Sequence, residues 1–332
     1  MNNFKKIGMT ALAASLVSTS VFAGELAVTG SASINWENYS GKEQSSTKSF
    51  TMGNQITFSG SGELDNGITV GLSFTIDEFD GAAASEAVVD TGSVFDAHKV
   101  TVSSDALGTF VFHGEGGDSA QSAVGDTAAG NIWDNFDLTG TTSILSESGF
   151  TNNSMHYTLP SMVDGVAVSA SYSPNKGLDE ADTAYAVVYT GVEGLTVSYG
   201  KGSSDGDAAG EGGTTANADT TSMKASYAYG PVTLAYSDHD HDSNTDISDQ
   251  TAKAMKISYT VSDAISVSYA TEEIDSKASA SNVDAEYTKI VTSYTSGGMT
   301  VSANYQEAEN IDFSTSALQD KEYYGLSLSF AF

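Results

Sequence analysis

The sequence ends on YGLSLSFAF, residues 324–332. Every second residue in this stretch is large and apolar, and the residues between them are glycine, serine or alanine. A period of two is that of a β-strand with one apolar face. In a closed sheet the last strand pairs with the first, because the unpaired backbone groups of a free edge cost free energy. We therefore expect the last strand to extend to the final residues. The apolar set is Tyr324, Leu326, Leu328, Phe330 and Phe332.

The same alternation recurs along the chain. Clear examples are residues 166–172, 195–199, 232–236, 265–269 and 301–305, each with apolar or aromatic residues alternating with serine, threonine or alanine. Counting such segments predicts about 16 strands, a number typical of the larger membrane barrels. Short and long connections between the segments alternate, as in barrels with tight turns at one end and longer loops at the other. The fold class we expect is therefore all-β, an antiparallel transmembrane β-barrel.

The first 23 residues have the features of an export signal. Lys5 and Lys6 precede an apolar and small-residue run, which ends at Val21-Phe22-Ala23 with the pattern of a cleavage site. This run is too short to cross a bilayer as a helix. We therefore expect a signal peptide at 1–23 and one barrel domain at 24–332.

The composition limits the possible functions. The chain has a net charge of −30, and all its basic residues are lysines. Removing the signal peptide, which holds two lysines and no acid, takes the charge to −32. Nucleic acid is not an expected partner, because phosphate contacts need basic side chains. The chain has no cysteine, which excludes disulfides and thiolate metal sites.

A secreted β-sandwich would also alternate apolar and polar residues. Two features favour a membrane barrel instead. The polar faces are mostly serine, threonine, glycine and alanine, which suits a wet lumen, and tyrosines recur near strand ends. Recurrent tyrosines are typical of an aromatic girdle at a lipid–water boundary.

Two stretches resemble the Gram-negative porin family, especially its alphaproteobacterial and neisserial types. One is the strand–turn–strand at 100–112, and the other is Asn153-Ser154-Met155-His156-Tyr157-Thr158-Leu159-Pro160 followed by the alternating run at 165–172. The resemblance implies a homotrimer of 16-stranded barrels in the outer membrane, in contact with lipid and lipopolysaccharide. The C-terminal aromatic residues are similar to the signal that the barrel-assembly machinery reads.

The resemblance also implies that the loop after the fifth strand, about Gly116 to Asn152, folds inward and narrows the pore. The alternative is an ordinary exposed polar loop. Family members commonly place an arginine near the start of this loop, but here the stretch is Phe112-His113-Gly114-Glu115. The absence of this arginine argues against a strong transverse electric field across the pore. The candidate constriction residues are Asp118, Asp126, Asp134, Asp137 and Glu147.

Candidate lumen-wall residues follow from the alternation, which puts several lysines and histidines on the polar faces. For each of them a solvated lumen side chain without a role in selectivity is the favoured alternative. The set is Lys99, His113, Glu115, His156, Lys224, Lys256 and Lys289.

One acidic stretch resembles a calcium loop, because Ca²⁺ takes several oxygen ligands. Its carboxylates alternate with His239 and His241, which could instead bind zinc. It lacks the glycine of an EF-hand loop, and a solvated external loop is the alternative. No cofactor is therefore expected beyond a possible loop-bound Ca²⁺. The candidate ligands are Asp238, Asp240, Asp242 and Asp246.

The function these features predict is passive diffusion of small hydrophilic solutes and ions, with cations favoured by the acidic composition. No histidine stands in a motif that pairs it with a nucleophile, so we do not expect an enzyme. The alternatives are a substrate-specific outer-membrane channel and a non-conducting structural or adhesive barrel.

Overall fold

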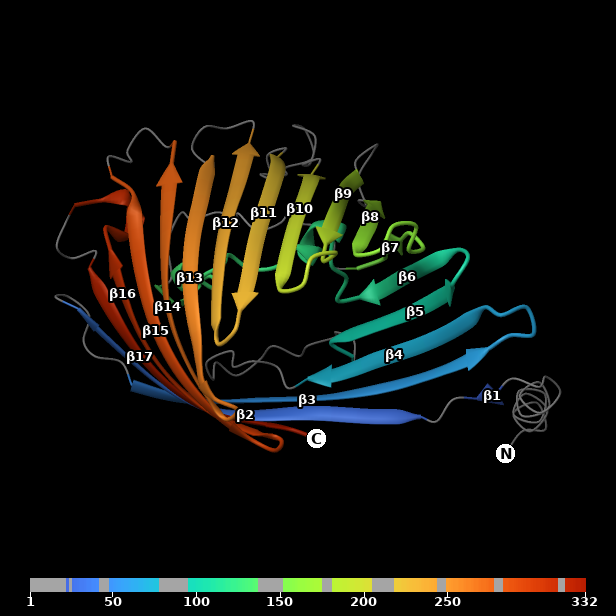
Figure 1. Cartoon of the computed structure of the whole chain (residues 1–332), viewed down its shortest axis with the longest axis horizontal. Helices are drawn as coiled ribbons and strands as arrows, with labels where there is room; N and C mark the ends of the chain where they lie inside the picture. Colours follow the sequence, from blue (N-terminus) through green and yellow to red (C-terminus); the bar gives the residue numbers. More distant parts are fainter. Residues whose placement is uncertain are drawn as a thin grey trace, which may run out of the picture.

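A single closed sheet makes up nearly the whole fold (Figure 1). The computed structural model describes residues 22–23, 26–41, 48–77, 95–136, 152–174, 181–204, 218–243, 249–277, 283–315 and 320–332. Apart from the two residues of β1 (Phe22–Ala23), sixteen antiparallel strands form the wall within these ranges. They are β2 (Ala27–Gly41), β3 (Lys48–Glu63), β4 (Thr69–Asp77), β5 (Ala97–Ser104), β6 (Gly108–Glu115), β7 (Ser154–Thr158), β8 (Val166–Pro174), β9 (Ala181–Tyr189), β10 (Leu195–Ser204), β11 (Ala218–Tyr229), β12 (Val232–Ser243), β13 (Gln250–Ser262), β14 (Ile265–Ser276), β15 (Ala285–Ser296), β16 (Met299–Glu309) and β17 (Lys321–Ala331).

Each strand pairs with its neighbours in the sequence, and β17 pairs with β2 to close the ring. The pairing of β17 with β2 runs from Lys321↔Gly41 to Ala331↔Ser31. Beyond it, the N–H of Gly30 donates to the carbonyl of Phe332 at 2.8 Å. The predicted closed barrel and its strand number are confirmed. Of the expected signal peptide, only Phe22 and Ala23 lie within the described residues.

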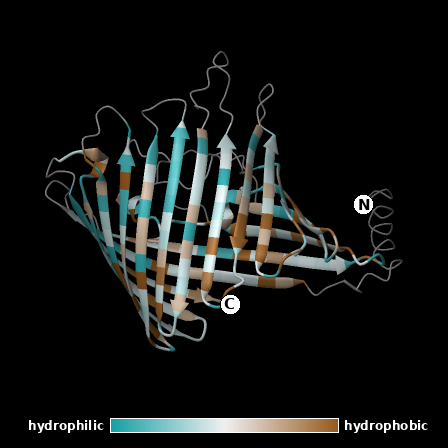
Figure 2. Cartoon of the chain, turned by 45° about the horizontal axis from the view of Figure 1, so that its top comes forward, coloured by the Kyte–Doolittle hydropathy of each residue, from teal (hydrophilic) through white to brown (hydrophobic). Residues whose placement is uncertain are grey.

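Alternation divides the side chains between two faces of the wall. Large apolar residues such as Leu72, Met223 and Leu326 belong to the outward face and are exposed. Figure 2 shows hydrophobic and hydrophilic residues interleaved along the strands. The inward positions of β8–β16 carry mostly serine, threonine and alanine, many of them buried. A closed sheet with an apolar outside and a small polar inside is the arrangement of a membrane barrel.

The outward face is not uniform around the ring. Each strand from β7 to β17 carries at least one outward tyrosine, whereas the described outward positions of β2–β6 carry none. In their place are Phe50, Met52, Ile34 and Leu72, all more than half exposed. We call the outward face of β2–β6 the tyrosine-free arc.

The described residues include three 3-10 helices besides the strands: η1 (Ala120–Ala123), η2 (Ile132–Phe136) and η4 (Ile311–Phe313). No helix among the described residues has the length and apolar character needed to cross a bilayer.

Candidate pore constriction

The segment after β6, residues 116–136, lies inside the barrel against the inner wall. Its first helix, η1, contacts β8, β9 and β10, and its second, η2, contacts β15 and β16. The segment therefore passes along the inner wall from β8 to β16 rather than out into solvent. In Figure 1 it is the green chain seen behind the yellow and orange strands. The predicted inward-folded loop is confirmed for the part of it that the structure describes.

Side chains of the wall hold the first half of this loop. The N–H of Ala120 donates to the Ser171 hydroxyl at 2.7 Å. The Gln121 amide donates to Ser222 at 2.9 Å and accepts from Thr220 at 2.7 Å. These contacts are buried, so each unmade bond would leave a polar group without water.

A single carboxylate holds the middle of the loop. Glu272, which is inward-facing on β14 and 2 % exposed, accepts from the Thr127 hydroxyl with one oxygen. Its other oxygen accepts from the N–H of Trp133 at 3.1 Å. Nearby, the N–H of Ala128 donates to the Ser237 hydroxyl at 2.7 Å. Burial of a carboxylate is tolerable here because its oxygens find donors.

The underside of the loop is apolar. Ile132 and Phe136 are fully buried, and the Phe136 ring lies 5.9 Å from that of Tyr287 on β15. They fit because the inner wall beneath them carries small residues, which leave space that larger side chains would fill. Those inner-wall residues are Ala252, Ala254, Ala270, Ala285 and Ala308.

A glycine makes room for η1. A Cβ atom at Gly200 on β10 would stand 2.9 Å from Cγ of Gln121 and 3.1 Å from a methyl carbon of Val124. The helix can therefore lie this close to β10 only over a residue without a side chain.

The loop presents its carboxylates to the lumen. Asp118, Asp126 and Asp134 are exposed, whereas Gln121, Val124, Thr127 and Ile132 between them are buried against the wall. The loop is thus amphipathic, with an acidic face toward the water of the barrel. Asp137 and Glu147, the other two candidates, lie outside the described residues.

Three of the predicted lysines lie on the inner wall near the loop. The Lys224 ammonium on β11 donates to the carbonyl of Asp126 at 2.8 Å. Lys256 and Lys289 stand in one row on β13 and β15, separated by Ala270. All three are only partly exposed. These cations therefore lie on the wall that carries the loop, not across the lumen from it.

The other basic candidates lie at the start of the loop. Lys99 on β5 is paired with His113 on β6, and His156 on β7 belongs to the same inner face. Both histidines are close enough to Asp118 for its charge to act on them. Lys99, His113 and His156 therefore lie beside Asp118, the first carboxylate of the loop.

Glu115 departs from its expected position. A register shift between His98 and Lys99 puts Glu115 opposite His98, with 3.8 Å between the His98 Nδ1 and a Glu115 oxygen. His98 is paired with Phe74, which belongs to the outward face. The alternation that placed Glu115 on the lumen wall is broken by this bulge.

The acidic stretch of β12 also differs from expectation. Asp238, Asp240 and Asp242 lie within β12, not in a loop, and their carboxylates share the outward face with Tyr236. His239 and His241 point the other way and are buried, and the Nδ1 atom of His239 lies 2.9 Å from the Ser222 hydroxyl. Asp246 lies outside the described residues, and among those described no group of three or more histidines and carboxylates could hold a metal ion. The strand assignment corrects the predicted loop, and calcium binding stays a prediction.

Sequence reasoning did not single out Glu272, Gln121 or Gly200. Glu272 interrupts an otherwise regular alternation next to Glu273, but nothing in that pattern shows that a loop more than a hundred residues earlier reaches it.

The C-terminal candidates lie as the alternation predicts. Tyr324, Leu326, Leu328 and Phe330 face outward on β17, and Phe332 follows the strand and is 73 % exposed. The Phe332 ring lies over Gly30, where a Cβ atom would be 2.6 Å from it.

Comparison with known proteins agrees with this geometry. The family model described as Gram-negative porin matches residues 8–332. This chain belongs to the Gram-negative porin family. It is therefore an outer-membrane protein with the channel architecture of a porin, and this family and fold are those of channels, not enzymes. No curated protein matches the sequence.

Solved structures share this porin's fold at low sequence identity. An anion-selective porin from Comamonas acidovorans has a TM-score of 0.67 at 16 % identity, covering 93 % of this chain and 100 % of that chain. A variant of Rh. blastica porin has a TM-score of 0.64 at 14 % identity, with the same coverages. An outer-membrane protein of Vibrio cholerae has a TM-score of 0.62 at 12 % identity, covering 94 % of this chain and 100 % of that chain. At these identities the likeness concerns the fold alone.

Proposed function

We propose that this porin lets small hydrophilic solutes and ions diffuse passively through a water-filled lumen, and that it favours cations. The observation that carries the cation preference is the acidic face of the loop, where Asp118, Asp126 and Asp134 are exposed inside the barrel. Lys224, Lys256 and Lys289 are half-buried in the wall behind the middle of the loop, whereas Lys99, beside Asp118, is exposed. Along the middle of the loop, a permeating ion therefore passes closer to Asp126 and Asp134 than to these three ammonium groups.

The total charge of the chain is a poorer argument for selectivity. Many acids of the described strands face outward by alternation, so they do not line the lumen. They are Asp219, Asp238, Asp240, Asp242, Glu273, Asp275, Glu286, Glu307, Glu309 and Glu322. The proposal rests on the loop rather than on the net charge of −30.

Planar-bilayer recording in a salt gradient tests this proposal. A reversal potential of the sign given by cation flux is expected, with conductance that rises in proportion to salt. A reversal potential of the opposite sign refutes the cation preference. Conductance that saturates and is blocked by one solute points to a substrate-specific channel, and a folded barrel without conductance points to a structural role.

We also propose that the protein assembles as a homotrimer through the tyrosine-free arc. Tyrosine rings recur at the borders of a wall that faces lipid, so an apolar arc whose described outward positions hold no tyrosine, although they include Trp36, fits a wall that faces protein. The chain has no cysteine, which makes single-cysteine labelling direct. With Leu72→Cys, labelling by a lipid-soluble maleimide in membranes should be slower than with the control Met223→Cys on β11. Equal labelling, or a monomer mass in mild detergent, contradicts the proposal.

Three further assignments remain proposals about the mature protein. Residues 1–23 act as a signal peptide, the outward C-terminal residues are read by the barrel-assembly machinery, and the long-loop end of the barrel contacts lipopolysaccharide. N-terminal sequencing of the protein from outer membranes tests the first. A mature chain that does not begin at Gly24 contradicts it.

A further inference from the structure

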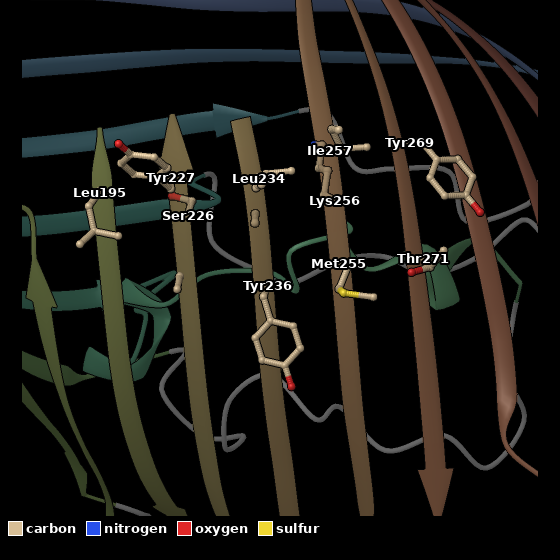
Figure 3. A pocket seen from close by; sticks show the side chains of 12 residues that line it. Leu195, Ser226, Tyr227, Leu234, Tyr236, Met255, Lys256, Ile257, Tyr269 and Thr271 are labelled. Atoms are coloured by element: carbon tan, nitrogen blue, oxygen red, sulfur yellow. The ribbon is translucent and has the colours of Figure 1, made fainter. Parts of the chain in front are cut away.

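Two lysines of the inner wall stand in one row, with one strand between them. Lys256 on β13 and Lys289 on β15 are both directly opposite Ala270 on β14. Figure 3 shows Met255 and Ile257, the neighbours of Lys256 along β13, among the apolar side chains of the outer wall. Alternation therefore directs the Lys256 side chain to the lumen. At about 4.8 Å between neighbouring strands, the two lysine backbones are about 9.6 Å apart.

These lysines lie on the short-connection side of the loop. Glu272, which anchors the loop, is opposite Ala254, and Ala254 comes two residues before Lys256 on β13. The row of Glu272 is thus the next row toward the long connections. The row on the other side carries short polar side chains, such as Ser258 opposite Ser268, both partly exposed. A solute can therefore reach the two ammonium groups from the short-connection end without crossing the acidic face of the loop.

The two lysines have no partner of opposite charge, although the chain is rich in acids. Neither ammonium forms an ion pair with a described residue. Among the described inward positions of these two rows on β12–β16, Glu272 carries the only carboxylate. Its oxygens already accept from Thr127 and Trp133 of the loop. The charge of Asp126 acts on Lys289 from the loop, but the two groups are not an ion pair.

A third lysine adds to the positive charge at this place. The charge of Lys256 acts on both Lys224 and Lys289, so the three ammonium groups are close enough to repel one another. Lys224 is held by the loop, since it donates to the carbonyl of Asp126 at 2.8 Å. Like charges kept together in a partly buried wall without a counter-ion cost free energy. An anionic ligand between Lys256 and Lys289 would offset this cost.

We propose that Lys256 and Lys289 form a binding site for the phosphate group of a solute in the lumen. Each ammonium donates to one oxygen of the phosphate, and the two positive charges balance its two negative charges. Lysine suits this role because a long, flexible stem carries its three donors. The site rests on the water-filled lumen of the proposed function and goes beyond it, because it adds a bound state for an anion to a pore that favours cations.

Charge and shape distinguish phosphate from other anions at this site. Chloride and a single carboxylate carry one negative charge each, which leaves one ammonium without a counter-ion. A dicarboxylate such as malonate carries two charges, but on separate carbon atoms. Phosphate presents both charges on oxygens of one tetrahedral centre, where two converging ammonium groups can share them.

Block of the potassium chloride current by inorganic phosphate tests the site. Phosphate is added to the porin in a planar bilayer at about pH 8, where it is mostly a dianion, with the ionic strength held constant. We expect a saturable fall in current. Lys256→Gln together with Lys289→Gln should weaken phosphate binding at least about tenfold, because charge-assisted hydrogen bonds are lost.

Two controls separate this site from the charge of the chain and of the lumen. Lys253→Gln removes a lysine from the exposed outward face of the same strand, β13, and Lys99→Gln removes an exposed lysine at the start of the loop. Both should leave the block unchanged. Heat-modifiable migration on a gel shows that each variant is folded. An unblocked parent, an equal block in the folded double variant, or a stronger block by malonate overturns the proposal.

Chemical labelling tests the same contact in the unaltered protein. The folded porin in detergent is acetylated with and without inorganic phosphate, and peptide mass spectrometry follows each lysine. Phosphate should slow the labelling of Lys256 and Lys289 several-fold and leave Lys253 and Lys99 unaffected. Because this result needs no ion flow, protection in a porin that does not conduct contradicts the proposed function and supports the site. Equal protection of all four lysines, or of none, overturns the site.

Discussion

Neutralising the acidic face of the loop should remove most of the cation preference. The change is Asp118→Asn, Asp126→Asn and Asp134→Asn together. These three side chains are exposed, and the one described side-chain hydrogen bond to an Asp126 carboxylate oxygen, from Asn131 at 3.1 Å, can be kept by an amide oxygen. Folding should therefore be little affected.

The size of the effect follows from Coulomb's law. For an ion path assumed to run about 7 Å from each carboxylate, Coulomb's law gives roughly 0.6 kcal/mol per carboxylate in water and about half of that at about 0.1 M salt. Three carboxylates together give about 0.9 kcal/mol, which concentrates a monovalent cation about fivefold and dilutes an anion by the same factor. The cation-to-anion permeability ratio should thus fall by a factor between about 5 and about 20.

The assay is the reversal potential of the purified porin in a planar bilayer with a potassium chloride gradient. The matched control is Asp238→Asn, Asp240→Asn and Asp242→Asn, which removes the same charge from the outward face of β12. The control should leave the permeability ratio nearly unchanged. If both triple variants lower the ratio equally, selectivity comes from the total charge and the reasoning from the loop is refuted.

The remaining predictions concern the loop anchor, the space beneath η1 and the closing seam. Glu272→Ala should leave the Thr127 hydroxyl and the Trp133 N–H without their buried acceptor, at a cost of about 1–3 kcal/mol for each group. The loop should then be less firmly held, and the single-channel current should become noisier. The control Glu273→Ala, on the outward face, should leave the current unchanged. Gly200→Val should displace η1 and alter the conductance, while Gly71→Val, where the nearest atom to a new Cβ lies at 3.7 Å, should conduct as the parent does. Phe332→Ala should lower the yield of heat-modifiable barrel on refolding, because the ring over Gly30 is lost; an unchanged yield assigns the ring no part in closure.

The wall could be predicted from the sequence because its signal is local. Residues two apart share a face, so a run such as 265–269 shows both its strand and its outward side without knowledge of any neighbour. Lys256 and Lys289 could be placed on the polar face for the same reason. The rule fails where the backbone departs from regular pleating, as at the bulge that turns Glu115 toward His98.

Residues whose position depends on distant partners could not be placed this way. The inward course of the loop depends on small residues of β13–β15, such as Ala254 and Ala270, and on Glu272, all more than a hundred positions later in the chain. Only the family resemblance predicted it. The polarity of both faces of the stretch 238–242 predicts a loop, but a strand that extends beyond the lipid can also be polar on both sides.

The seam between β17 and β2 also constrains how the chain can fold. It joins positions almost three hundred residues apart, as in the 2.6 Å hydrogen bond from the Ser327 hydroxyl to Asn35. Until β17, the last strand to be synthesised, pairs with β2, the backbone N–H and C=O groups along one edge of β2 have no hydrogen-bond partners in lipid. Stepwise insertion of single hairpins would expose that edge at every stage, so the ring has to close before or as it enters the bilayer. The slowest event on the folding pathway is then the meeting of the two ends, and its rate is set by topology more than by any individual contact.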